Sequence, residues 1–90
     1  MLEAFSLDRI EGELEAGFAF AAAAEEYRSD REKFGACMSD ALECYAYAVR
    51  FLGHPELTTE QRQLLGVNLS ELQRRLDLLR EKKLSPSAAA

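Results

Sequence analysis

A leucine repeat in the last third of the chain constrains the fold more than any other sequence feature. The leucines follow one another in alternating steps of four and three residues, at Leu65, Leu69, Leu72, Leu76 and Leu79. An α-helix turns once every 3.6 residues, so this spacing places all five on one side of a helix. Such a helix has to bury that side against a partner, and we expect the partner to be the rest of the chain.

The whole sequence predicts three helices, at about 8–28, 30–52 and 59–83. Alanine, leucine, glutamate and arginine dominate it, and these residues favour helix, whereas no segment alternates as a strand does. Ninety residues make one domain, which we expect to cover 1–84, with a disordered tail at 85–90. Short connections place consecutive helices antiparallel. The predicted fold is therefore all-α, an up-down-up antiparallel three-helix bundle.

Capping signals mark the predicted helix boundaries. Ser6 or Asp8 can cap the first helix, and the capping box TTEQ at 58–61 begins the third. The sequence SDRE at 29–32 favours a break between the first two helices, because serine and aspartate compete for local backbone hydrogen bonds. One long continuous helix is the alternative. Gly53, soon followed by proline, predicts the end of the second helix.

The second helix carries apolar residues over more than half of its circumference. A helix that is apolar on most sides is buried on most sides, so we expect it to be the central helix, packed against both neighbours. Its apolar positions are Phe34, Cys37, Met38, Ala41, Leu42, Cys44, Tyr45, Ala48, Val49, Phe51 and Leu52.

The first helix has an apolar stripe and, beside it, a stripe of small residues. Small side chains let two helix backbones approach closely, which can compensate the roughly 1 kcal/mol that a glycine costs inside a helix. The apolar stripe is Ile10, Leu14, Phe18 and Ala21; the small stripe is Gly12, Ala16, Ala19 and Ala23.

Cys37, Cys44 and His54 are the residues best suited to metal or redox chemistry. The two cysteines are seven residues apart, so their Cα atoms lie about 10.5 Å apart in a helix, beyond the roughly 7 Å limit of a disulfide. Zinc sites usually use cysteines two to four residues apart. We expect reduced cysteines that act as small buried apolar residues, and a histidine in a loop. A metal site and an intermolecular disulfide are the alternatives.

No other pattern is typical of a catalytic site. Glu11 and Glu15 share a helix face but lack the accompanying histidine of a di-iron site, and we expect a solvated face. The sequence contains no glycine-rich phosphate loop, nucleophile elbow or CxxC motif. We therefore predict that the chain is not an enzyme and has no catalytic residue, metal or cofactor.

Charge and hydropathy limit the possible partners. The net charge is −5, with seven acidic and two basic residues in 1–28 but four acidic and six basic residues in 58–90. An acidic chain is a poor general binder of nucleic acid. The longest uncharged apolar stretch, Ala16–Ala24, is too short to cross a bilayer. We expect no nucleic-acid or membrane partner, and a cytoplasmic location with reduced thiols.

Four residues are predicted to contact a protein partner. Tyr47 and Arg50 lie together on the polar side of the second helix, an arrangement typical of an interface hot spot. The alternative for Tyr47 is a ring that packs against its own chain. The second expected contact surface is a groove beside the third helix, and Arg74 and Arg75 of that helix are also expected to contact a partner.

Three segments resemble known helical modules: ALECYAYAVRFL at 41–52, AAAAEEYRSD at 21–30 and NLSELQRRLDLL at 68–79. Their order resembles the microtubule-interacting and trafficking (MIT) domain, and also one tetratricopeptide-like helical pair with an added helix. Both resemblances imply a non-enzymatic module that binds peptides or helices in grooves between its own helices. No second copy is present at the 34-residue period of a tetratricopeptide array.

The leading functional prediction is thus a non-enzymatic protein–protein interaction module, either an adaptor or a small subunit of a larger assembly. A homodimer that completes its core with a second copy is one alternative. The other is a small acidic inhibitor that uses the acidic first helix to imitate nucleic acid.

Overall fold

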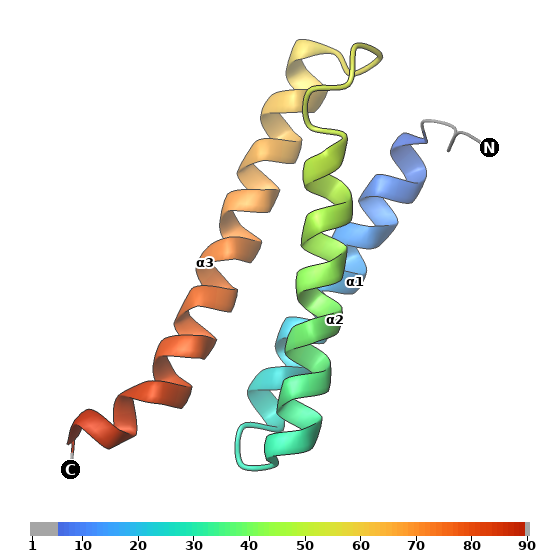
Figure 1. The fold of residues 1–90 in the computed structure, drawn as a ribbon. Coiled ribbons are helices and arrows are strands. Elements are labelled where there is room, and N and C mark those ends of the chain that lie inside the picture. The colour runs from blue at the N-terminus through green and yellow to red at the C-terminus, as the bar shows by residue number, and fades with distance from the viewer. Residues whose placement is uncertain (1–5, 90) are drawn as a thin grey trace.

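A computed structural model describes the backbone of residues 6–89 and the side chains of residues 6–81. It contains three helices, α1 (Leu7–Glu26), α2 (Arg31–Arg50) and α3 (Thr59–Ala89), and no strand within the described backbone. The helices run up, down and up (Figure 1). This confirms the predicted all-α three-helix bundle and the break between the first two helices.

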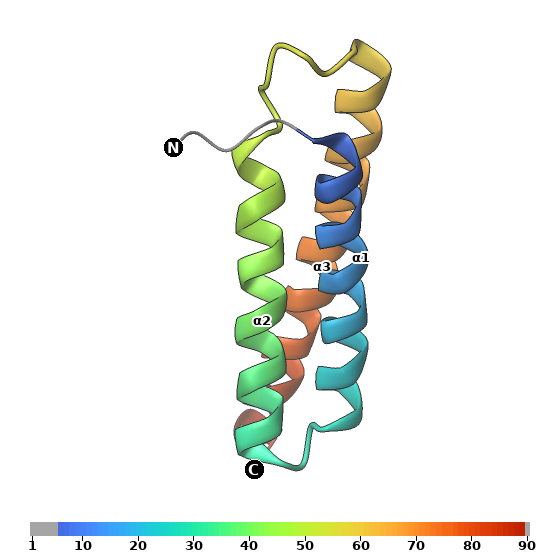
Figure 2. The ribbon, with the colours of Figure 1, turned by 90° about the vertical axis from the view of Figure 1, so that its right-hand side faces the viewer.

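The three helices form the corners of an elongated bundle measuring 50 × 25 × 18 Å. α1 and α2 make the most extensive contact, and each also contacts α3. In Figure 1 α2 stands between the other two helices, but in Figure 2, turned by 90°, α3 lies behind and between α1 and α2. No single helix is therefore central.

The prediction that α2 is buried on most sides is wrong. Leu42 and Val49 on α2 are 40% and 41% exposed. Each helix in a three-helix bundle has only two neighbours, which leaves the side turned away from both of them in solvent. α2 buries one stripe, made of Phe34, Met38, Ala41, Cys44 and Ala48.

The leucine repeat of α3 is buried as the spacing predicts. Its five members are between 0% and 4% exposed. They belong to the same core as three residues of the predicted α1 stripe, Ile10, Leu14 and Ala21, whereas Phe18 is half-buried against it. The core is thus built from one side of each helix.

Close helix approach occurs at Gly17, which lies outside the predicted small-residue stripe. Gly12 and Ala19 of that stripe are exposed, and a Cβ added at Gly12 would meet no atom within 4 Å. A Cβ added at Gly17 would lie 2.9 Å from Leu72 Cδ2 and 3.2 Å from Cys44 Cβ. Gly17 is therefore a position on α1 at which α2 and α3 both come close.

Side-chain hydrogen bonds cap the N-terminal ends of α1 and α2. Ser6 rather than Asp8 caps α1, because its Oγ accepts a hydrogen bond from the Arg9 N–H at 3.2 Å. The Oδ1 atom of Asp30 accepts from the Lys33 N–H at 3.1 Å and begins α2 just after the predicted break. Each cap satisfies a backbone donor that the first helical turn leaves without a carbonyl partner.

The predicted capping box at the start of α3 is confirmed in both directions. Thr58 Oγ1 accepts from the Gln61 N–H at 3.0 Å, and Gln61 Oε1 accepts from the Thr58 N–H at 2.9 Å. This reciprocal pair fixes where the loop from α2 ends and α3 begins.

The end of α2 differs from the prediction. The helix ends at Arg50, and Gly53 does not adopt the positive φ of a glycine helix stop. Instead, the half-buried Arg62 side chain holds the connecting loop from α3. Its Nε donates to the Leu52 carbonyl at 3.0 Å, and its Nη2 donates to the carbonyls of His54 at 3.1 Å and Leu57 at 3.4 Å.

At the other end of the molecule, α3 continues to Ala89, past the helix end predicted at 83. Residue propensity does not explain this extension, because Pro86 disfavours a helix interior more than Ala88 and Ala89 favour it. The helix takes in most of the segment predicted as a tail, and the disorder expected for 85–90 stays a prediction.

Candidate functional site

The first predicted partner surface, around Tyr47 and Arg50, is engaged within the chain. The Tyr47 ring is half-buried, and its centroid lies 5.0 Å from Arg9 Cζ of α1 and 5.1 Å from Arg50 Cζ. The Phe51 ring centroid is 5.2 Å away. Guanidinium groups at such distances interact favourably with an aromatic ring. The geometry agrees with the alternative in which the ring packs against its own chain, and partner contact there stays a prediction.

The second predicted pair, Arg74 and Arg75, is organised by Glu71. Arg74 donates from Nε to Glu71 Oε1 at 3.2 Å and from Nη2 to Oε2 at 2.7 Å, and Arg75 Nε donates to Oε2 at 3.3 Å. The hydrogen bonds from Arg74 and then from Arg75 lower the pKa of the Glu71 carboxyl, and the bond to Glu71 raises the pKa of Arg74. All three groups lie at the surface, where such pairs contribute little to stability.

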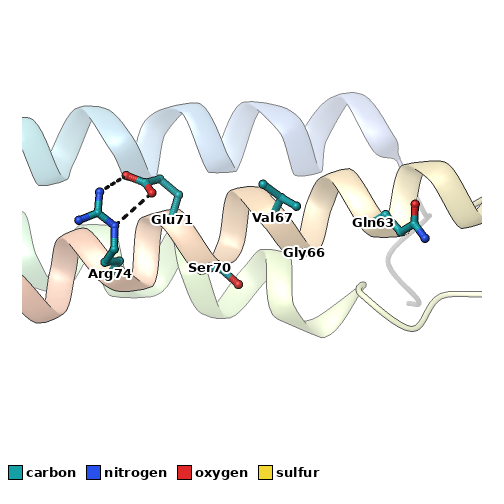
Figure 3. Close-up of a pocket in the computed structure, with 6 residues that line it drawn as sticks. All are labelled: Gln63, Gly66, Val67, Ser70, Glu71 and Arg74. Atoms are coloured by element: carbon teal, nitrogen blue, oxygen red, sulfur yellow. Dashed lines mark hydrogen bonds and ion pairs between the residues drawn. The ribbon is translucent and has the colours of Figure 1, made fainter.

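The two arginines point to different surroundings. Arg75 Cζ lies 5.4 Å from the ring centroid of Phe18 and therefore faces α1. Arg74 lines a shallow surface pocket on α3 together with Gln63, Gly66, Val67, Ser70 and Glu71 (Figure 3). The four predicted residues are thus divided between the α1–α2 side of the bundle and α3.

This surface of α3 contains apolar residues that the sequence analysis did not single out. Leu64 and Val67 are 60% and 63% exposed, and Leu78 is 42% exposed. We call Leu64, Val67, Glu71, Arg74 and Leu78 the outer stripe. Its members follow one another in steps of three and four residues, the spacing of one helix face. That second repeat, offset from the leucine repeat, is the sequence signal that could have identified the surface.

Figure 3 shows the centre of the outer stripe. Glu71 and Arg74 are joined by two hydrogen bonds, and Val67 lies about one turn nearer to the N-terminal end of α3. The stripe therefore presents an apolar residue next to a matched pair of opposite charges.

Grooves flank α3 on both sides. On the α1 side, Leu14, Phe18 and Asn68 line a shallow groove. On the α2 side, Leu42 and Tyr45 line another, where the Tyr45 hydroxyl donates to Gln73 Oε1 at 3.2 Å. Grooves therefore lie on both sides of α3, but neither is lined by Arg74 or Arg75, and binding of a partner in them stays a prediction.

Both cysteines are free thiols, with Cys44 buried and Cys37 half-buried. Burial, followed by a hydrogen bond to Glu13 and nearby carboxylates, raises the pKa of Cys44 from 9.0 to about 11. A thiol with a raised pKa is a weak nucleophile and a weak metal ligand at neutral pH. Cys44 thus occupies a core position, as expected of a small apolar residue.

His54 lies in the loop between α2 and α3, as predicted. Its Nδ1 accepts a hydrogen bond from the Glu56 N–H at 3.1 Å, and its carbonyl accepts from Arg62. In the described part of the chain, no three histidine, cysteine, aspartate or glutamate side chains are grouped as a metal site would require.

Comparison with known proteins gives no relative: no family model, no curated protein and no solved structure matches this chain. Among the described residues, none of the helices combines the length and the apolar character needed to cross a bilayer. The observed three-helix all-α fold is compatible with the helical-hairpin modules that the sequence resembles.

Proposed function

We propose that the chain is a non-enzymatic protein–protein interaction module, an adaptor or a small subunit of a larger assembly. One observation carries the proposal: Leu64 and Val67, about one turn apart on α3, leave more than half of their surface in solvent. Large apolar residues that are exposed together and bordered by polar groups are typical of protein-binding surfaces.

The shape of the surface indicates the kind of partner. From Leu64 to Leu78 the outer stripe extends about 21 Å along the α3 axis, at 1.5 Å per residue. A regular stripe of this length is suited to a helix laid alongside α3, which would bury Leu64 and Val67 on adjacent turns and Leu78 about three turns further along. Arg74 and Glu71 would then contribute orientation more than affinity.

The resemblance to the MIT domain and to tetratricopeptide-like helical pairs supports the same kind of partner, because both bind peptides or helices. The grooves on either side of α3 provide the surfaces that such binding uses. A reducing compartment such as the cytosol, in which free thiols such as Cys37 and Cys44 persist, is the proposed place of action.

Quantitative affinity capture with matched bait proteins tests this proposal. The Leu64→Glu/Val67→Glu variant places charges on the outer stripe, whereas the control Ala36→Glu/Val49→Glu places the same charges on exposed positions of α2 that line neither groove. We expect proteins that the unaltered chain enriches to be retained by the control and lost with the outer-stripe variant. Circular dichroism verifies that both variants fold.

A third bait, Tyr47→Ala/Arg50→Ala, tests the other predicted surface in the same experiment. If it loses the captured proteins while the outer-stripe variant retains them, the binding surface lies on the α1–α2 side. If all baits recover the same proteins equally, the proposal that these surfaces bind partners is wrong.

A further inference from the structure

We propose that the outer stripe of α3 binds the outer stripe of a second copy of this chain, with the two α3 helices antiparallel. This inference depends on the proposed interaction function and names its partner. It rests on two features of the stripe, its seven-residue repeat and the order of its charges.

The repeat of the outer stripe is that of a helix that pairs with another helix. Its members alternate in steps of three and four residues, the pattern of the a and d positions of a coiled coil. Leu64, Val67 and Leu78 are all exposed, while the leucine repeat, one or two residues further along, fills the core. α3 thus has a packing stripe that its own chain uses and a second one that it leaves in solvent.

The charges of Glu71 and Arg74 determine the direction in which a second α3 helix can pair with the stripe. Leu64, Glu71 and Leu78 are the a positions of the stripe, and Val67 and Arg74 are its d positions. In an antiparallel pair, a positions face d positions. A two-fold axis level with the Leu72–Gln73 bond therefore places Glu71 opposite Arg74 of the second copy. The symmetry repeats this contact in the other direction. The same axis places Val67 opposite Leu78 of the second copy, so an apolar pair flanks the charged centre on each side.

The parallel arrangement is opposed by the same charges. In register, a positions face a positions, so Glu71 would face the Glu71 of the second copy and Arg74 would face the second copy's Arg74. Like charges placed against each other disfavour that pairing. The order Val67, Glu71, Arg74, Leu78 is therefore complementary to itself only when reversed.

The size of the contact predicts a weak dimer. One helix face about 21 Å long buries less than the roughly 1,600 Å² of a standard stable interface. Glu71 already has intrachain partners in Arg74 and Arg75, so exchanging one arginine for its counterpart adds direction more than affinity. We expect association in the high micromolar range.

Analytical ultracentrifugation of the full chain, from about 10 µM to about 1 mM, measures this association. The average mass should rise with concentration from the 10.1 kDa of one chain toward twice that value. Val67→Glu should weaken dimerisation at least about tenfold, whereas Val49→Glu, an exposed valine on α2, should leave it unchanged.

Charge reversal and cross-linking test the pairing itself. Glu71→Arg and Arg74→Glu should each prevent dimerisation alone, and an equimolar mixture of the two variants should restore it. With Cys37 replaced by serine, a mixture of Val67→Cys and Leu78→Cys chains should form a disulfide-linked pair under oxidation, and neither variant alone should do so.

A chain that stays monomeric at about 1 mM, a dimer indifferent to Val67→Glu, or a disulfide formed by Val67→Cys alone would each overturn the inference. A monomeric chain whose captured proteins still depend on Leu64 and Val67 would leave the interaction module intact, with a different helix as its partner.

Discussion

Leu64 and Leu65 are neighbours in the chain with identical side chains, yet one is 60% exposed and the other 4%. Leu65 belongs to the leucine repeat, and Leu64 to the outer stripe. Both sets have the spacing of one helix face, so spacing shows that a helix has a packing face but not whether the same chain supplies the partner. Only the placement of α1 and α2 distinguishes them.

The largest expected effect on stability comes from replacing leucine by alanine on the buried side of α3, compared with the same replacement on its exposed side. Leu72→Ala removes a fully buried side chain and should lower the free energy of unfolding by about 2–5 kcal/mol. Leu64→Ala should change it by no more than about 0.5 kcal/mol, because its side chain is mostly in solvent. Urea denaturation measures both; similar losses would show that the outer stripe contributes to the core.

Alanine at two of the helical glycines, Gly17 and Gly66, should change stability in opposite directions and so tests the same comparison. Gly66→Ala should raise the free energy of unfolding by about 0.5–1 kcal/mol, because a Cβ there meets no atom within 4 Å and alanine favours helix. Gly17→Ala should lower it by about 0.5–2 kcal/mol, since overpacking against Leu72 and Cys44 exceeds that gain.

A double-mutant cycle tests the cause assigned to Gly17. In a Leu72→Ala background the nearest clashing atom is absent, so Gly17→Ala should cost less there than in the unaltered chain. Equal costs in the two backgrounds would show that Leu72 is not the obstacle.

The last expected effect is seen only at alkaline pH and concerns the buried thiol of α2. The pKa of Cys44 is raised to about 11, so the folded state favours the neutral thiol. Its contribution to stability is then complete below pH 9 and is lost as the pH rises toward 11. The difference in free energy of unfolding between the unaltered chain and Cys44→Ala should therefore shrink over this range.

Alkylation offers a second measurement of the same thiol. At neutral pH the thiolate fraction of Cys44 is about 100-fold below that of an ordinary cysteine, so an alkylating reagent should modify Cys37 first. Cys37→Ser isolates the Cys44 signal in mass spectrometry. Rapid modification of Cys44 in the folded chain would contradict its burial.

Local signals predicted the elements of the fold well. Thr58 and Gln61 form the expected capping box, and the helix break falls at Asp30, because both depend on contacts within a few residues. The burial of the leucine repeat was equally predictable, since a helix with so regular an apolar stripe has to cover it.

The candidate site was predictable only in part. Arg74 was selected from the sequence, but Leu64 and Val67 were not, because an apolar residue in a helical sequence is more often buried than exposed. Tyr47 was selected as an interface residue, and only the fold shows Arg9, from a distant part of the chain, against its ring.

The sequence by itself determined the three helices and the side of α3 that packs inward, because capping and periodicity act over one or two turns. The tertiary structure decided what depends on distant segments. It decided that Gly17 rather than Gly12 meets the neighbouring helices, that Arg62 holds the α2–α3 loop, and that the outer stripe stays in solvent. Each of these depends on how close two helices come, a distance set by the packing of all three together.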